Sequence, residues 1–146
     1  MSLKEYWAKR DFKVTGEPQG EVQDKMGNVY VVQKHHATHL HYDLRLEREG
    51  VLKSWAVPKE PPVEKGVKRL AVQVEDHPLE YAGFEGVIPE GEYGAGTVEI
   101  WDHGTYDTEM WKEDTITVHI KGEKLAGRYC LIQFKKQENA WLLFKC

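Results

Sequence analysis

Apolar and polar residues alternate without a break from Leu40 to Glu47. Leucine and tyrosine fill the even positions, whereas the odd positions hold histidine, aspartate, arginine and glutamate. Residues i and i+2 of a β-strand point to the same face, so this alternation is typical of a strand with one buried face. It places His41, Asp43 and Arg45 together on the polar face of that strand.

Short extended segments, separated by turn signals, follow one another along most of the chain. The turn residues at 48–50 and 135–140 predict two hairpins. Near the N-terminus, Ser2 and Glu5 have the spacing of a capping box and predict a short helix that ends before a Gly/Pro loop. We expect strands near Val29–Lys34, Leu40–Arg48, Val51–Val57, Lys68–Glu75, Thr97–Trp101, Thr115–Ile120, Arg128–Phe134 and Trp141–Phe144.

About eight short strands with little helix predict a mainly β fold, because closing or curving the sheet hides its edges. An antiparallel barrel and a strongly curved sandwich both satisfy this pattern. The segment 85–97 holds four glycines and one proline, which predicts irregular backbone. Its GEYGAG sequence lacks the lysine and Ser/Thr of a phosphate-binding loop.

Composition limits the classes of function. The 146 residues fit a single domain over 1–146, and 40% hydrophobic with 30% charged residues is typical of a globular protein. A net charge of −4 argues against a protein that coats nucleic acid, but it is compatible with one that grips a single phosphate or a chain end. Without a long apolar run or an apolar signal core, we expect a cytoplasmic protein. Cys130 and Cys146 lack metal-ligand spacing and are expected to be free thiols.

The strand near residue 70 is predicted to have a polar face of its own. Apolar residues at 70, 72 and 74 alternate with polar ones, which puts Arg69, Glu75 and His77 on one face. His77, if free to titrate near neutral pH, is a candidate general acid or transition-state donor.

Imidazole and carboxylate groups together suit a divalent cation such as Mn²⁺, Fe²⁺ or Zn²⁺. His41 and Asp43 need a third ligand, which His35, His36 or His39 can supply. Cationic side chains beside such a metal indicate phosphate, whose oxygens accept bidentate hydrogen bonds from arginine.

Arg45, Lys59 and Arg69 would form that phosphate cradle, and the reaction implied is metal-assisted phosphoryl transfer or hydrolysis. Two other functions share parts of the pattern. Two histidines and one carboxylate also bind iron in non-haem oxygenases, although such enzymes have less need of several cations. A non-catalytic module that binds nucleic-acid ends would use the same cations but leaves the histidines unexplained.

Two stretches carry a resemblance to a known family. VVQKHHATHLHYDLRLEREGVLKSWAVPK, at 31–59, and KRLAVQVEDHPLEYAGFEGVIPEGEYGAGTVEIWDHGTY, at 68–106, resemble the 3′-phosphoesterase domain of DNA ligase D. The likeness runs from about Arg10 to the C-terminus. It implies a compact antiparallel β-barrel of about eight strands with a short N-terminal helix. It also implies an Mn²⁺-dependent enzyme, with other divalent transition metals as alternatives.

The activity implied by this resemblance has two steps on a strand end. A 3′-terminal ribonucleoside is removed to leave a 3′-phosphate, and the phosphate is then removed to leave a 3′-OH for repair synthesis or ligation. The implied partners are nucleic-acid 3′ ends and a separate ligase and polymerase, and we expect a monomer that does not bind membranes.

The resemblance also selects site residues. It implies His35, His41 and Asp43 as metal ligands, with His36 and His39 left to surface roles. It implies these catalytic residues: Arg45, Glu75, His77 and Tyr81. It implies these residues that bind phosphate or substrate: Arg10, Asp11, Glu17, Lys59 and Arg69.

Overall fold

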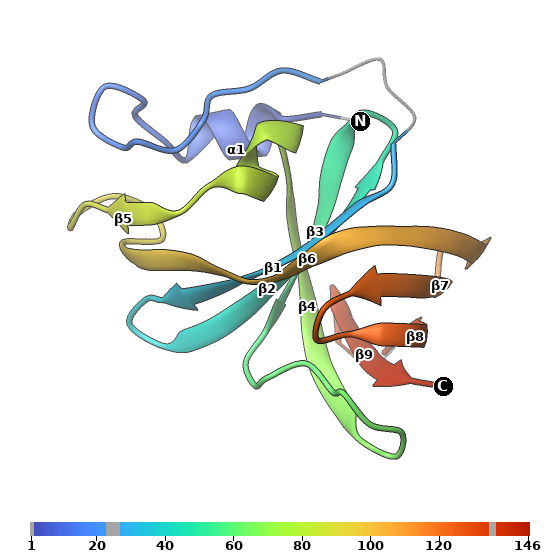
Figure 1. The fold of residues 1–146 in the computed structure, drawn as a ribbon. Helices are drawn as coiled ribbons and strands as arrows, with labels where there is room; N and C mark the ends of the chain where they lie inside the picture. Colours follow the sequence, from blue (N-terminus) through green and yellow to red (C-terminus); the bar gives the residue numbers. More distant parts are fainter. Residues whose placement is uncertain (1, 23–26, 135–136) are drawn as a thin grey trace.

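The chain forms an antiparallel sheet that curls round and closes on itself (Figure 1). The structure is a computed structural model that describes residues 2–22, 27–134 and 137–146. Its helices and strands are α1 (Lys4–Ala8), β1 (Val29–His36), β2 (Leu40–Arg48), β3 (Val51–Val57), β4 (Lys68–His77), the 3₁₀-helix η1 (Leu79–Gly83), β5 (Gly86–Ile88), β6 (Gly96–Trp111), β7 (Thr115–Gly122), β8 (Ala126–Gln133) and β9 (Ala140–Lys145).

Strand β6 closes the sheet. It pairs with β1 along one edge and with β5 and β7 along the other. Eight of the described strands therefore form a ring in the order β1-β2-β3-β4-β9-β8-β7-β6, and β5 is a short addition outside it. Each strand of the ring has a neighbour on both sides, which removes the unpaired edges of an open sheet. The predicted antiparallel barrel with a short N-terminal helix is confirmed.

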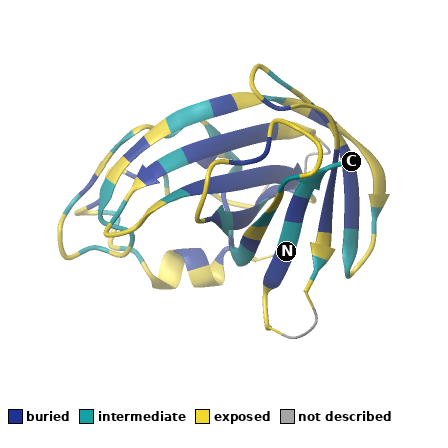
Figure 2. Ribbon diagram, turned by 90° about the horizontal axis from the view of Figure 1, so that it is seen from below, coloured by how far each residue is buried: buried dark blue, intermediate teal, exposed yellow. Residues whose placement is uncertain are grey.

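Apolar side chains from every strand of the ring fill the inside of the barrel. Buried positions lie along the strands, and exposed ones lie at the turns and along parts of strands such as β6 (Figure 2). The alternation predicted on β2 is confirmed, since Tyr42, Leu44 and Leu46 belong to this core. Leu40, at the start of the strand, stays exposed.

A second apolar cluster lies outside the barrel, where α1 and η1 pack on β3 (Figure 1). Its buried members are Leu3, Tyr6, Val51, Leu52 and Tyr81. This outer layer helps to cover the polar face of β2, where Asp43 is 6% and Arg45 3% exposed. The polar groups singled out from the sequence therefore lie between the barrel wall and the outer layer, and not inside the barrel.

Strand β4 contains a β-bulge that changes which side chains face the outer layer. Leu52 of β3 pairs with His77, but Ser54, two residues later, pairs with Val74. Two steps along β3 thus match three steps along β4, so β4 holds one extra residue. A side chain beyond the bulge points to the face opposite to the one that simple alternation predicts.

The predicted common face of Arg69, Glu75 and His77 is therefore wrong. Ala71, which shares the face of Arg69, lies in the barrel core, and Leu70 is 40% exposed although it was expected to be buried. Glu75 and His77 instead turn toward the outer layer, because the bulge exchanges the two faces.

Helix α1 starts without the predicted capping box. Leu3 is the N-cap residue and makes no side-chain capping bond, whereas Oγ of Ser2 accepts a hydrogen bond of 3.1 Å from the backbone N–H of Lys4.

Among the described residues, no helix has the length and apolar character needed to cross a membrane.

Strands β5 and β6 also differ from the sequence prediction. Strand β5 forms in the segment that was predicted to be irregular, because it can pair with the edge of β6. Strand β6 continues ten residues past the predicted end at Trp101, to Trp111. The hairpin between β8 and β9 pairs as predicted, while residues 135–136 of its turn lie outside the described residues.

Candidate active site

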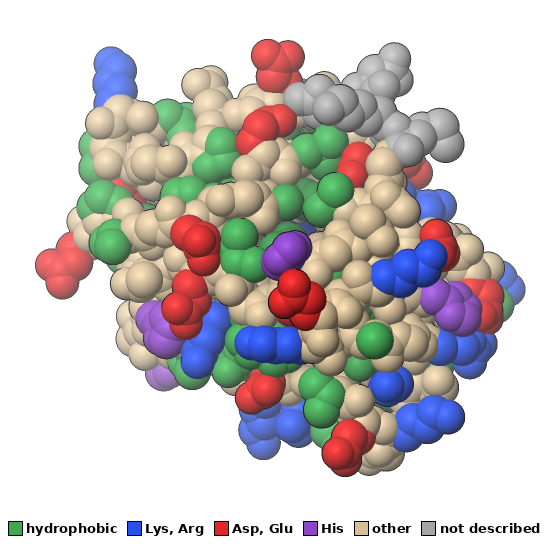
Figure 3. Space-filling view, viewed as in Figure 1, with side chains coloured by type: hydrophobic (Ala, Val, Ile, Leu, Met, Phe, Trp, Pro, Cys, Tyr) green, Lys and Arg blue, Asp and Glu red, His purple; other side chains and the backbone are tan. Residues whose placement is uncertain are grey.

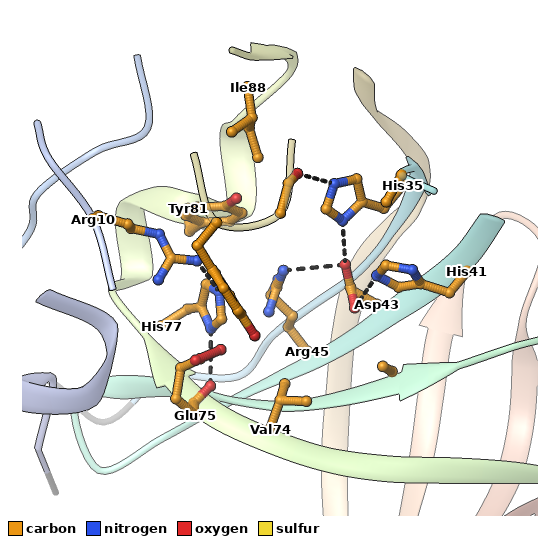
Figure 4. A pocket seen from close by; sticks show the side chains of 14 residues that line it. Arg10, His35, His41, Asp43, Arg45, Val74, Glu75, His77, Tyr81 and Ile88 are labelled. Atoms are coloured by element: carbon orange, nitrogen blue, oxygen red, sulfur yellow. Dashed lines mark hydrogen bonds and ion pairs between the residues drawn. The ribbon is translucent and has the colours of Figure 1, made fainter. Parts of the chain in front are cut away.

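The hairpin of β1 and β2 brings three predicted metal ligands together (Figure 4). His35 lies directly opposite His41 in the register of the two strands, and Asp43 follows His41 on the same face. Nδ1 of His35 is 3.6 Å from Oδ2 of Asp43, and Nε2 of His41 is 3.3 Å from Oδ1 of Asp43. The possible ligand atoms of this His-His-Asp cluster all lie within 4.8 Å of one another.

Of the three histidines considered as the third ligand, His35 is the one that joins the cluster. His36 is exposed, and its Nε2 lies 3.1 Å from Oε1 of Glu99 on the surface. His39 is also exposed. The alternation along β1 explains the difference, since neighbouring residues of a strand point to opposite faces.

Backbone carbonyls fix the orientation of both imidazoles. Nε2–H of His35 donates a hydrogen bond of 2.6 Å to the carbonyl of Gly94, and Nδ1–H of His41 donates one of 3.1 Å to the carbonyl of His39. A carbonyl can only accept, so these ring nitrogens carry the protons. The other nitrogen of each ring faces Asp43, where it either carries a second proton and donates to the carboxylate or, without that proton, is free to ligate a metal.

The electrostatics of the cluster also fit a cation. Burial alone would raise the pKa of Asp43, but hydrogen bonds with His35 and His41 and the charge of Arg45 hold it well below its usual range. Burial would lower the pKa of His41, yet the hydrogen bond and charge of Asp43 outweigh this and raise it. Two lone pairs and a carboxylate that converge in this way need a positive charge between them, either as protons or as a metal ion. Ligands of one transition-metal ion lie roughly 3–4 Å apart, so the residues present fit such an ion.

Arg45 lies beside the cluster in a fixed orientation. Its Nε donates to Oε1 of Gln33 at 2.7 Å and its Nη1 to Oγ of Ser54 at 2.8 Å, while its Nη2 is 3.5 Å from Oδ2 of Asp43. A guanidinium has five N–H groups, so donors remain for a ligand. The plane of Arg45 is therefore set before any ligand binds.

Arg10 enters the same cavity from the segment after α1. Its Nη1 donates to the carbonyl of Tyr6 at 3.0 Å, and its Nη2 lies 3.4 Å from Nε2 of His77. Nδ1 of His77 donates to the carbonyl of Glu75 at 2.9 Å, so Nε2 is the acceptor of the ring. Burial, followed by the charges of Arg45 and Arg10, lowers the pKa of His77 well below its ordinary value. The prediction that His77 titrates near neutral pH is therefore wrong.

Glu17 lies behind the cavity and holds two of its side chains. Its Oε2 accepts hydrogen bonds from Nε of Arg10 at 3.0 Å and from the hydroxyl of Tyr81 at 2.6 Å, and its Oε1 accepts one from Thr15 at 2.9 Å. Burial raises the pKa of the Tyr81 phenol, which therefore stays protonated. At the rim, Nζ of Lys9 lies 2.6 Å from Oε2 of Glu75.

These groups line one cavity of about 280 Å³. The predicted site residues that line it are Arg10, His35, His41, Asp43, Arg45, Glu75, His77 and Tyr81. The other predicted site residues do not line it. Glu17 lies behind it, and Asp11 is exposed and accepts a hydrogen bond from the backbone of Lys13. Lys59 is exposed beyond the end of β3, and Nε of Arg69 donates to the neighbouring carbonyl of Glu60 at 2.9 Å.

Several residues of the site escaped the sequence reasoning. Gln33 and Ser54 hold Arg45, Lys9 pairs with Glu75, and Gly94 holds His35. Gln33 and Ser54 are polar residues within strands and 0% exposed, and their alternation with the apolar neighbours Val32 and Trp55 was a usable signal. Gly94 and Lys9 gave no such signal, because their contacts join segments that are distant in sequence.

Sequence comparisons identify the family of this chain. The profile of the DNA Ligase D 3′-phosphoesterase domain matches residues 33–133. The chain belongs to this family. Among its relatives are the multifunctional non-homologous end joining proteins LigD of Pseudomonas aeruginosa, which is 50% identical over 98% of this chain and 18% of the relative, and of Mycobacterium bovis, which is 53% identical over 96% and 19%. The counterpart from Mycolicibacterium smegmatis is 49% identical over 96% of this chain and 20% of its own length.

This DNA ligase D 3′-phosphoesterase domain thus spans about a fifth of the length of these curated relatives. The family profile starts at Gln33 and so includes all three residues of the His-His-Asp cluster. Arg10 and Glu17 precede the profile, but the Pseudomonas relative aligns with 98% of the chain, which includes them. The family resemblance identified from the sequence is confirmed.

Proposed function

We propose that this DNA ligase D 3′-phosphoesterase domain, taken as one unit over 1–146, is a metal-dependent phosphoesterase that heals the 3′ ends of DNA or RNA strands. It removes a 3′-terminal ribonucleoside to leave a 3′-phosphate, and then removes that phosphate to leave a 3′-OH. The observation that carries the proposal is the position of Arg45, whose Nη2 is 3.5 Å from Asp43 of the His-His-Asp cluster. A fixed guanidinium beside a metal site suits an oxyanion such as phosphate, whose oxygens accept paired hydrogen bonds and share charge with a metal.

His35, His41 and Asp43 would hold Mn²⁺ or another divalent transition metal, which as a Lewis acid polarises a phosphoryl oxygen and offsets its negative charge. Arg45 donates its remaining N–H groups to the phosphate oxygens. Gln33 and Ser54 keep the guanidinium in place, so little reorganisation is needed when charge develops in the transition state.

The far side of the cavity has a second, supporting role. Arg10 offers a second guanidinium, which Glu17 orients from behind. His77 acts as a neutral hydrogen-bonding group that aligns Arg10, since its lowered pKa leaves no imidazolium to serve as a general acid at neutral pH. Tyr81 keeps its proton and packs its ring on Arg45, 4.8 Å from the guanidinium carbon to the ring centroid. Glu75 anchors Lys9 at the rim.

Residues outside the cavity have roles away from the reacting phosphate. Lys59 and Arg69 lie outside the cavity and would act on the strand beyond the terminal phosphate, so their substitution should raise KM more than it lowers kcat. Asp11 shapes the turn after α1, where its Oδ1 accepts the N–H of Lys13 at 3.0 Å.

A ligase and a polymerase would use the 3′-OH product. Acidic and basic side chains are interspersed on the face seen in Figure 3, which suits recognition of an end and not coating of a duplex.

The test is incubation with a 5′-labelled primer–template that ends in a single 3′-ribonucleotide, with Mn²⁺ or with a chelator. We expect metal-dependent shortening to a 3′-phosphate end and then to a 3′-OH end on a denaturing gel. Binding without any processing would support the end-binding module instead. Because the chain belongs to a phosphoesterase family, we favour a phosphoesterase over an iron-dependent oxygenase. Oxygen consumption with Fe²⁺ and 2-oxoglutarate would instead support the oxygenase.

A further inference from the structure

Tyr93 combines two properties at the mouth of the cavity. It lines the cavity together with His35, Arg10 and Glu75, and 48% of its surface is exposed. Among the described residues, no other large hydrophobic side chain both lines this cavity and is exposed. An aromatic ring that is open to solvent beside phosphate-binding groups resembles the platforms on which single-stranded nucleic acids stack their bases.

The loop that carries Tyr93 is held firmly. Two turn hydrogen bonds, from Glu92 N–H to the carbonyl of Pro89 and from Ala95 N–H to the carbonyl of Glu92, brace it. Gly94, the next residue, has a φ of +76°, and a Cβ there would lie 3.3 Å from Cε1 of His35. Its carbonyl accepts the hydrogen bond from His35. The backbone next to Tyr93 is thus joined to the His-His-Asp cluster through Gly94.

Two cations lie over the ring of Tyr93. Nζ of Lys9 is 4.7 Å and Cζ of Arg10 is 5.5 Å from the ring centroid. Arg10 lines the cavity, and Lys9 pairs with Glu75, which also lines it, so the ring lies beside groups that would attract a phosphate.

The cavity is small, and Tyr93 is on its exposed side. Its volume of about 280 Å³ lies at the lower limit of the roughly 300–1,000 Å³ that is usual for small-molecule pockets. The exposed ring is therefore accessible to a base that stays outside when its phosphate enters.

We propose that Tyr93 stacks on the base of the nucleotide whose phosphate enters the cavity and so selects strands that end in an intact base. The proposal rests on the proposed function, because that function supplies the phosphate and its nucleotide. Stacking on one aromatic ring corresponds to roughly 5- to 150-fold in affinity. The domain should therefore bind an end with a base more tightly than an abasic end by a factor in this range.

The test compares two 5′-fluorescein primer–templates with a 3′-phosphate, one with a normal terminal nucleotide and one with an abasic terminal residue. Binding is measured by anisotropy in chelator, where no turnover occurs, and KM is measured with Mn²⁺. Wild type should prefer the normal end, and Tyr93→Phe should keep the preference. Tyr93→Ala should bind both ends equally. Val87→Ala is the matched control, since Val87 is 68% exposed on the adjacent β5 but does not line the cavity.

Three results would overturn the inference. If Tyr93→Ala lowered the affinity for both ends by the same factor, the ring would only support Lys9 and Arg10. An unchanged preference in that variant would assign discrimination to another group, and no preference in wild type would exclude stacking. Failure of the proposed function looks different, because wild type would then leave the strand uncut with Mn²⁺ whatever its binding preference.

Discussion

Oε1 of Gln33 accepts a hydrogen bond of 2.7 Å from Nε of Arg45, and the amide of the same glutamine donates to the carbonyls of Tyr81 and Phe84. One side chain, which is 0% exposed, therefore joins the guanidinium to η1 and its C-terminal end. It connects the barrel wall to the outer layer at the point where the candidate site lies between them.

Removing this connection should lower both stability and activity. Gln33→Ala leaves the Nε–H of Arg45 and the carbonyl of Phe84 without the glutamine, while the carbonyl of Tyr81 keeps the N–H of Phe84. Each unsatisfied buried group costs about 1–3 kcal/mol. We expect the free energy of unfolding to fall by roughly 2–5 kcal/mol in urea titrations, with a loss of kcat. Gln137→Ala, at an exposed position, is the control and should change neither. Wild-type stability in Gln33→Ala would show that water replaces the glutamine at little cost.

The adjacent histidines His35 and His36 offer a matched test of the metal site. Ligand binding raises the stability of the folded state by about 2.7 kcal/mol at a hundredfold excess over Kd. Saturating Mn²⁺ should therefore raise the Tm of wild type and of His36→Ala, but not that of His35→Ala. The readout is the melting temperature with and without chelator, and it does not depend on turnover. A full Mn²⁺ response in His35→Ala would exclude this residue as a ligand.

Arg45 should not be replaceable by another cation. Lysine retains the charge, but a single ammonium does not have the planar fork that reaches Gln33, Ser54 and a phosphate together. We expect Arg45→Lys to reduce kcat on the order of 100-fold and Arg45→Ala to reduce it further. Arg48→Ala is the control on the same strand, because Arg48 stacks on Trp111, 4.3 Å from the ring centroid, and is not part of the cavity. Near-normal rates in Arg45→Lys would limit Arg45 to a role as a point charge.

The buried pair of Arg10 and Glu17 should be important for stability. The side chains are 5% and 0% exposed, and Nε of Arg10 is 3.0 Å from Oε2 of Glu17. Breaking a buried pair by removing one charge typically costs about 3–5 kcal/mol. Glu17→Gln retains the shape and should show a loss in this range by urea unfolding, whereas Glu21→Gln, at an exposed position, should not. A loss as small as that of Glu21→Gln would mean that solvent reaches Arg10.

His77 should make stability depend on pH in a defined direction. Its folded-state pKa is lowered from the ordinary value of 6.5, so the unfolded chain binds the additional proton first as the pH falls. The contribution of His77 is complete above pH 6.5 and is lost below it, by up to about 1.4 kcal/mol per pH unit.

The measurement is the urea unfolding of wild type and His77→Gln at pH 7.0 and pH 5.5. Wild type should lose more stability on acidification than the variant, which lacks the titrating ring. His103→Gln is the control, because His103 is exposed on β6. Equal pH dependence in wild type and His77→Gln would contradict a neutral, buried His77.

The alternation on β2 made part of the site predictable, because Leu44 and Arg45 each follow the rule that neighbouring strand residues point to opposite faces. The same rule failed on β4, where one extra residue before His77 exchanges the faces, and nothing in the local sequence marks that bulge. Turn signals and strand lengths, which are local properties, predicted a mainly β fold but left a barrel and a curved sandwich open, and the family resemblance selected the barrel.

Long-range contacts account for the remaining differences. The contacts of Lys9 with Glu75 and of Gly94 with His35 join residues that are 66 and 59 positions apart in the sequence. A local hydrophobic pattern cannot predict contacts between segments so far apart. Arg10, Glu17 and Tyr81 could be predicted only through family resemblance, because each is a single residue in an irregular segment or in the short 3₁₀-helix η1, with no periodic pattern around it.

The two faces of β2 also constrain how this strand can pair during folding. A slip of one residue against β1 or β3 would turn Asp43 and Arg45 into the barrel core and Leu44 out toward the cavity. A misregistered hairpin would therefore bury charges without partners and expose a leucine at the same time. The residues that suit β2 to bind a phosphate thus also penalise its misfolded alignments, so that selection for activity and selection for correct folding act on the same strand.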